Sequence, residues 1–175
     1  MLLRRIAIKG DRGTGKTTLF QSVLAFMENI SLTYQGFQTF FTDECELILQ
    51  WINLAYQPVV MAQKTGKQSM KPFFHRLDEI GEILQQTSMI SKIFVADEIG
   101  FLEQFSISMQ RGIIKAITDA PFCIMTLKKG DYRFLKQITA MDDLILYDLD
   151  EYNQRQKEDL LQSVLGIIQT HMKKK

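Results

Sequence analysis

The chain has 175 residues and a formal net charge of +1, with 46% hydrophobic and 23% charged residues. This composition excludes intrinsic disorder, and the length predicts a single domain over residues 1–175, since domains typically hold about 100–200 residues. Only two cysteines are present, which excludes a disulfide-held secreted fold, and the nearly neutral charge gives no reason to expect nucleic acid as a partner.

The expected location is the cytoplasm. Arg4 and Arg5 interrupt the apolar residues at the N-terminus, whereas a secretory leader needs an unbroken apolar stretch. No apolar run in the sequence approaches the roughly 20 residues that span a bilayer, so we expect no membrane association.

Short apolar runs alternate with stretches of helical periodicity along the chain. The runs predict strands at 6–8, 37–42, 58–61, 93–96, 122–127 and 144–149. The periodic stretches predict helices at 19–27, 73–86, 105–118 and from about 154 onward. Continuous apolar strands are typical of a parallel sheet that is covered on both faces. The alternation therefore predicts an α/β fold in three layers around a mainly parallel central sheet.

The strongest motif is the run Gly10-Asp11-Arg12-Gly13-Thr14-Gly15-Lys16-Thr17, which matches G-x-x-x-x-G-K-[ST] at every fixed position. A predicted strand precedes it and a predicted helix follows, as a phosphate-binding loop requires. Backbone N–H groups from about Gly13 to Thr18 would cradle phosphates at the helix N-terminus. Lys16 would bridge the β- and γ-phosphates, and the Thr17 hydroxyl would bind Mg²⁺. The motif predicts a site for ATP or GTP.

Two acids end the buried strand predicted at 93–96. Asp97 is expected at the carboxyl edge of the sheet beside the phosphate loop, where it would hold Mg²⁺ in a Walker B arrangement. Glu98 is the candidate for polarising an attacking water molecule. The structural alternatives are a helix N-cap for Asp97 and a hydrogen bond to the loop for Glu98.

The run Asp97-Glu98-Ile99-Gly100-Phe101-Leu102-Glu103 resembles a signature of the THEP1-like nucleoside-triphosphatases, which belong to the P-loop kinase-like group. The same family carries a G-F-x-T segment, matched by Gly36-Phe37-Gln38-Thr39. A late strand before an N-[RQ] helix start is matched by Leu146-Tyr147-Asp148 and Asn153-Gln154-Arg155.

This resemblance implies a RecA-like sandwich and Mg²⁺-dependent hydrolysis of ATP, GTP and related triphosphates to the diphosphate and phosphate. It implies that Lys16 and Glu98 are catalytic and that Thr17 and Asp97 hold the metal. It also implies that Thr39 lies near the γ-phosphate. The phosphate cradle implied is Gly10, Gly13, Gly15, Lys16, Thr17 and Thr18. The predicted nucleotide-binding loop also includes Asp11, Arg12 and Thr14.

The chain departs from the family after G-F-x-T, where Phe40 to Cys45 lacks the usual Arg and glycines, and residues 43–72 show no match. Two alternatives therefore stay open. One is a nucleotide or small-molecule kinase, in which the basic segment 128–133 would act as a lid. The other is a nucleotide-dependent switch that acts through a protein partner with slow turnover. The sequence does not determine the oligomeric state.

Three weaker features have two readings each. Lys129 and Asp131 fit part of a guanine-reading [NT]-K-x-D motif, but Lys128 stands where Asn or Thr belongs, so the match is interpreted as chance. Arg12 is expected to be solvated rather than in contact with phosphate. The aromatic residues of 40–74 are expected mainly in the core, with a base-stacking or partner surface as the alternative; these are Phe40, Phe41, Trp51, Tyr56, Phe73 and Phe74.

Overall fold

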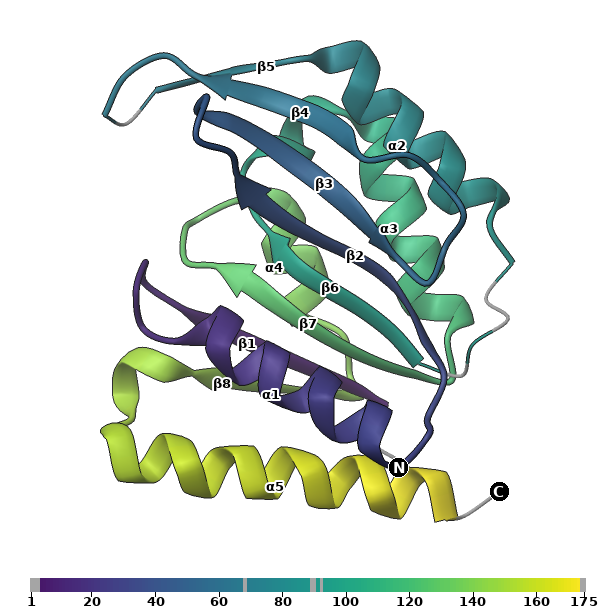
Figure 1. Ribbon diagram of the computed structural model, residues 1–175, viewed down its shortest axis with the longest axis vertical. Helices are drawn as coiled ribbons and strands as arrows, with labels where there is room; N and C mark the ends of the chain where they lie inside the picture. The colour runs from purple at the N-terminus through teal and green to yellow at the C-terminus, as the bar shows by residue number, and fades with distance from the viewer. Residues whose placement is uncertain (1–3, 68, 89–90, 92, 174–175) are drawn as a thin grey trace.

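The computed structural model describes residues 4–67, 69–88, 91 and 93–173, and every structural statement below concerns this part of the chain (Figure 1). Within it, eight strands form one sheet in the order β5-β4-β3-β2-β6-β7-β1-β8. The strands are β1 (Arg5–Gly10), β2 (Tyr34–Phe41), β3 (Glu46–Ile52), β4 (Val59–Lys64), β5 (Met70–Pro72), β6 (Ile93–Ile99), β7 (Phe122–Lys128) and β8 (Leu144–Asp148).

The helices lie on both faces of this sheet, which gives the three layers predicted from the sequence (Figure 1). They are α1 (Lys16–Asn29), α2 (Phe74–Gln86), α3 (Ile107–Asp119), α4 (Arg133–Thr139) and α5 (Gln154–Lys173), with short 3-10 turns η1 (Leu102–Phe105) and η2 (Leu149–Glu151). None of the helices in the described ranges is long and apolar enough to cross a membrane.

Side-chain alternation along the strands divides the core into two clusters. Ile6 and Ile8 of β1 pack with α1 and α5, whereas Ala7 between them belongs to the cluster under α2, α3 and α4. Both faces of the inner strands are thus buried, and this is why those strands read as continuous apolar runs. The fold-class prediction is confirmed.

The sheet has a parallel part and an antiparallel part. The strands β2, β6, β7, β1 and β8 run parallel, so their carboxyl ends meet at one edge. The strands β3, β4 and β5 add to β2 as an antiparallel wing. The sequence predicted β4 but missed β3 and β5, as well as helix α4. The predicted start of α3 at Phe105 was also wrong, because the Ser106 hydroxyl caps the helix by accepting from the Met109 N–H at 3.0 Å.

Gly36 fixes how closely β2 approaches β6. A Cβ at this position would lie 1.8 Å from the carbonyl oxygen of Val95, so only glycine fits between the two backbones. The G-F-x-T segment therefore has a packing reason: it brings Thr39 to the sheet edge next to β6, where Gln38 pairs with Asp97.

The expectation of a mainly buried aromatic set was wrong for four of its members. Trp51 is buried edge-on against Phe37, but Phe40, Phe41, Tyr56 and Phe74 are 42%, 47%, 43% and 56% exposed. Phe40 and Phe41 are exposed because β2 continues past the end of its pairing with β6, at Gln38. There the strand has β3 on one side and no parallel neighbour on the other.

Candidate active site

The loop between β1 and α1 has the backbone shape that anion binding requires. Gly13 and Gly15 have φ angles of +83° and +96°, which residues other than glycine rarely adopt. No other atom lies within 4 Å of a Cβ built at either position, so the glycines are needed for conformation and not for space. Gly15 directly precedes α1, whose first N–H groups have no partner within the helix and are available to bind an anion.

Lys16 is enclosed by this loop. Its side chain is nearly buried, and its ammonium donates to the carbonyl oxygens of Gly10 at 2.8 Å and Asp11 at 3.0 Å. The same nitrogen lies 3.1 Å from the carboxylate of Glu98. The loop and the end of β6 thus converge on one cation, although 82 residues separate Lys16 from Glu98 in the chain.

Asp97 is buried, at 2% exposure. The Thr126 hydroxyl donates a hydrogen bond to its carboxylate. Burial raises the pKa of Asp97 above its usual value, and the hydrogen bonds from Thr126 and Thr17 partly counteract the shift. The effect of Thr17 on the Asp97 pKa places the two residues predicted as metal ligands near each other.

Glu98 lies next to Asp97 but remains about one third exposed. Its backbone N–H donates to the Thr39 hydroxyl at 3.2 Å, so β2 helps to fix its position. A carboxylate that is both anchored and open to solvent can accept a proton from a water molecule. Thr39, which the family resemblance placed near the γ-phosphate, lies beside the Glu98 backbone.

Thr126 was missed in the sequence. It is fully buried in β7, the strand between β1 and β6, and its hydroxyl reaches Asp97. The available signal was a single hydroxyl in the apolar run Phe122–Leu127. A buried polar group needs a hydrogen-bond partner, so a hydroxyl at this position predicts a partner at the edge of the sheet.

The signature turn after Glu98 is held by a second buried acid, Glu103. Its carboxylate accepts the Gly100 N–H at 2.9 Å, which closes the turn onto itself. Burial raises the pKa of Glu103 to about 7; the charge of Glu98 acts in the same direction and that of Lys128 opposes it. The sequence supplied the motif, but it did not reveal that Glu103 holds the backbone behind Glu98.

The basic segment 128–133 does not form a free lid at Lys129. Its ammonium lies 2.6 Å from Asp150 and 3.9 Å from both Asp148 and Asp11. Its hydrogen bond to Asp150 raises the pKa of Lys129 and lowers that of Asp150. Asp150 also accepts the backbone N–H of Asp11 at 3.1 Å, so these charges fasten two neighbouring loops to the phosphate loop.

Three other residues singled out in the sequence have different surroundings. Arg12 is exposed, as expected. Thr14 closes the loop locally: its hydroxyl donates to the Asp11 carbonyl at 2.9 Å, and its own carbonyl accepts from Lys157 at 2.8 Å. Asp131 pairs with Lys136 at 2.5 Å and not with Lys129.

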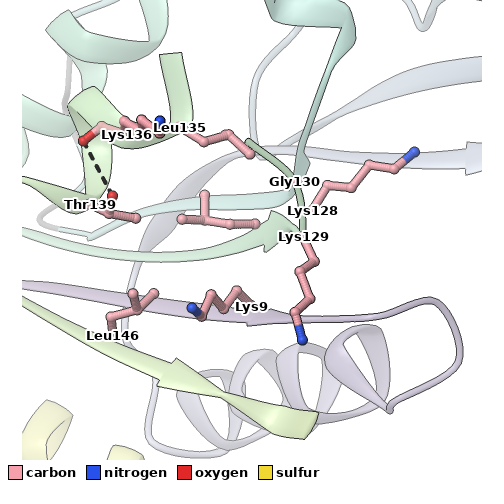
Figure 2. A pocket seen from close by; sticks show the side chains of 9 residues that line it. Lys9, Lys128, Lys129, Gly130, Leu135, Lys136, Thr139 and Leu146 are labelled. Carbon is pink, nitrogen blue, oxygen red and sulfur yellow. Dashed lines mark hydrogen bonds between the residues drawn. The ribbon is translucent and has the colours of Figure 1, made fainter. Parts of the chain in front are cut away.

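A cavity of about 150 Å³ lies beside this region, between α4 and the ends of β1, β7 and β8 (Figure 2). Four of its lining residues are lysines, but their ammonium groups do not converge. The side chains of Lys128 and Lys129 diverge, and Lys9 forms an ion pair with Asp148 at 3.2 Å. The cavity wall consists largely of lysine stems and leucines, which gives no concentrated anion site.

Comparison with known proteins agrees with this geometry. A family model described as NTPase matches residues 5–165. Two relatives named nucleoside-triphosphatase THEP1 are each 26% identical: one from Thermotoga petrophila, covering 94% of this chain and 92% of the relative, and one from Thermotoga maritima, covering 94% and 95%. The crystal structure of THEP1 from the hyperthermophile Aquifex aeolicus shares the fold, with a TM-score of 0.72 at 20% identity over 93% of this chain and 98% of that one.

Proposed function

The chain belongs to the NTPase family, and on that premise we propose that it hydrolyses nucleoside triphosphates such as ATP and GTP to the diphosphate and phosphate. The observation that carries the proposal is the 3.1 Å contact between Lys16 and Glu98. It joins a phosphate-binding cation to a candidate general base within one site. The relatives named nucleoside-triphosphatase support the same reaction class.

Phosphate binding is assigned to the loop from Gly10 to Thr18. Its N–H groups at the start of α1 would surround the β- and γ-phosphates, because the first turn of a helix offers unpaired donors and a partial positive charge. Lys16 would exchange its carbonyl partners for phosphate oxygens. Asp150 holds the Asp11 N–H and thereby supports the loop from outside.

Mg²⁺ is the metal that the available ligands suit. Asp97 and Thr17 would supply a carboxylate and a hydroxyl oxygen that lie near each other, and Mg²⁺ prefers hard oxygen ligands. When bound, the ion would neutralise charge that develops on the phosphate oxygens. Thr126 would orient the Asp97 carboxylate through its hydrogen bond.

The hydrolytic step is assigned to Glu98. Its carboxylate takes a proton from water as the water oxygen bonds to the γ-phosphorus. The bond between that phosphorus and the bridging oxygen breaks, and its electron pair stays on the diphosphate. The Thr39 contact with the Glu98 backbone keeps the base aligned.

We extend the proposal to organisation and location. Residues 1–175 are taken as one NTPase domain, which agrees with the single sheet that runs through the described residues. A cytoplasmic location is supported by Cys45 and Cys123, both free thiols, since disulfides are rare in that compartment.

The test is phosphate release from a panel of Mg-nucleoside triphosphates, with wild type and Glu98→Gln compared side by side. Candidate nucleosides and nucleoside monophosphates are added in parallel reactions. The proposal expects release without any acceptor and its loss in the variant. Phosphate transferred to an added acceptor would instead make the protein a kinase.

A third outcome would point to the switch reading. It is tight nucleotide binding with almost no release, together with a partner that binds only in the presence of nucleotide. Lys16→Ala would then abolish nucleotide binding and partner binding together. A partner whose binding ignores the nucleotide would exclude this reading.

A further inference from the structure

The last residue of β7 and the residue after it are both lysines, yet their surroundings differ. Lys129 is held by acids, whereas the side chain of Lys128 diverges from that of Lys129 (Figure 2). The Lys128 ammonium lies 4.8 Å from the centre of the Phe101 ring. Among the residues that the structure describes, no carboxylate lies within ion-pair distance of Lys128. Of these two adjacent lysines, Lys129 is therefore fixed by charges and Lys128 rests on an aromatic ring.

Lys128 packs on the turn that follows Glu98, which begins at Gly100 and Phe101. A Cβ at Gly100 would lie 3.3 Å from Cδ and 3.4 Å from Cβ of Lys128, so glycine at this position lets the lysine stem pack across the turn. Phe101 provides the ring beneath the ammonium. Glu103 fixes the Gly100 N–H and attracts the lysine charge. Three residues of the signature run thus interact with the side chain of Lys128, which belongs to the neighbouring strand β7.

The position of Lys128 in the sheet places it between the two halves of the site. In the β1–β7 pairing Lys128 stands opposite Gly10, the first residue of the phosphate loop. On the other side Leu127 stands opposite Ile99, the residue after Glu98. Lys128 therefore leaves the sheet edge between the phosphate cradle and the candidate base.

The ammonium is held in a way that allows it to move. A single contact between a lysine and an aromatic ring at an exposed site is a weak restraint. The four-carbon stem is flexible and carries a compact charge. Lys129, with three carboxylates around it, lacks this freedom.

We propose that Lys128 is the transition-state cation of this enzyme, seated on the Gly100–Phe101 turn and moving onto the γ-phosphoryl group during hydrolysis. The inference rests on the proposed NTPase activity and adds to it a residue that acts in cis. As water attacks and the electron pair of the breaking bond passes to the diphosphate, negative charge grows on the phosphoryl oxygens, and Lys128 neutralises it. No proton is transferred to or from the lysine.

The experiment compares Lys128→Met with wild type. Methionine keeps an unbranched stem for packing on Gly100 and Phe101 but removes the charge. We expect kcat to fall about 10²-fold, the scale of one preorganised group in a transition state, while KM for the Mg-nucleotide changes less than about threefold. Lys128→Arg should retain most of the rate. Lys136→Ala, which removes a nearby exposed lysine, should leave both constants unchanged.

A second measurement separates catalysis from packing. Binding of Mg-ADP with aluminium fluoride, which mimics the transferring phosphoryl group, should weaken in Lys128→Met, whereas binding of a non-hydrolysable Mg-ATP analogue should not. Equal kcat in wild type and Lys128→Met, or equal weakening of both ligands, would overturn the inference alone. Absence of phosphate release by wild type would overturn the proposed function and this inference with it.

Discussion

The two parts of the sheet differ in what the chain requires of their residues. In the parallel part, the ends of β1, β6 and β7 bring Lys16, Asp97 and Thr126 together, each with named partners. In the antiparallel wing of β3, β4 and β5, the residues form strand pairs and a buried contact of Trp51 with Phe37. In the parallel part, the contacts between side chains require particular residue types. In the antiparallel wing, strand pairing and burial require only an alternation of apolar and polar residues.

The largest effect is expected at Lys16, where both halves of the site meet. Lys16→Ala removes the cation that contacts the Gly10 and Asp11 carbonyls and Glu98. We expect nucleotide affinity and turnover to fall together, with kcat/KM lowered by at least about 10³-fold. Isothermal titration and phosphate release measure the two losses. An unfolding transition like that of wild type serves as the control. Normal turnover in the variant would contradict the assignment of the active site to this region.

Glu98→Gln is expected to separate binding from chemistry. Glutamine keeps a hydrogen-bond acceptor toward Lys16 but is not a useful base, so turnover should fall about 10²–10³-fold while Mg-nucleotide affinity remains. Single-turnover phosphate release and titration with a fluorescent nucleotide provide the comparison. If turnover is unchanged, Glu98 has no part in the mechanism.

The difference between the two parts also explains what the sequence revealed. Gly13 and Gly15 of the phosphate loop need positive φ angles, and Lys16 must lie within the loop to reach its carbonyls, so these positions form a motif that the sequence reveals. The buried strands β1, β6 and β7 were found for a related reason, since burial on both faces demands apolar runs. In β3 the exposed Gln50 lies between the buried Leu49 and Trp51, and many sequences satisfy such a pattern.

Tertiary partners account for the remaining omissions. Thr126 is one hydroxyl in a strand until β6 places Asp97 beside it. Lys128 and Lys129 are equivalent in sequence, yet the end of β8 surrounds only Lys129 with acids. Contacts of this kind join residues far apart in the chain, and local pattern carries no trace of them.

Glu103, beside the parallel part of the sheet, is expected to make the stability of the fold depend on pH. Its pKa in the folded chain is about 7 instead of 4.5, because burial disfavours the charged form. The folded state therefore binds more protons than the unfolded state between these values. Its contribution to stability is complete below about pH 4.5 and is lost as the pH rises through about 7. The two values differ by an amount that corresponds to roughly 3 kcal/mol.

Glu103→Gln tests this dependence. The amide oxygen can still accept the Gly100 N–H, but it does not ionise beside Glu98 and Lys128. We expect the variant to gain stability relative to wild type as the pH rises from 5 to 8.5, by an amount approaching roughly 3 kcal/mol. Urea unfolding at both pH values measures it. A constant difference between the two proteins across this range would show that Glu103 does not titrate there.

The smallest effects are expected along β2, where the two parts of the sheet join. Thr39→Ala removes the hydroxyl that accepts the Glu98 N–H, so kcat should fall about tenfold, which corresponds to one hydrogen bond of about 1.4 kcal/mol. Phe40→Ser combined with Phe41→Ser changes two exposed side chains just beyond. Such surface changes usually alter stability by less than about 0.5 kcal/mol, and kcat should stay within about twofold.

Phosphate-release kinetics on these variants place the boundary of the active site within one strand. If the Phe40 and Phe41 variant loses nucleotide affinity with its kcat intact, the exposed rings contact the base, and the wing belongs to the site. If it matches wild type, the site ends at Thr39, because β2 pairs with the catalytic strand β6 only up to Gln38 and contacts Glu98 last through Thr39. The wing would then serve to hold β2 in register, and its sequence would be free to diverge wherever strand pairing and burial are preserved.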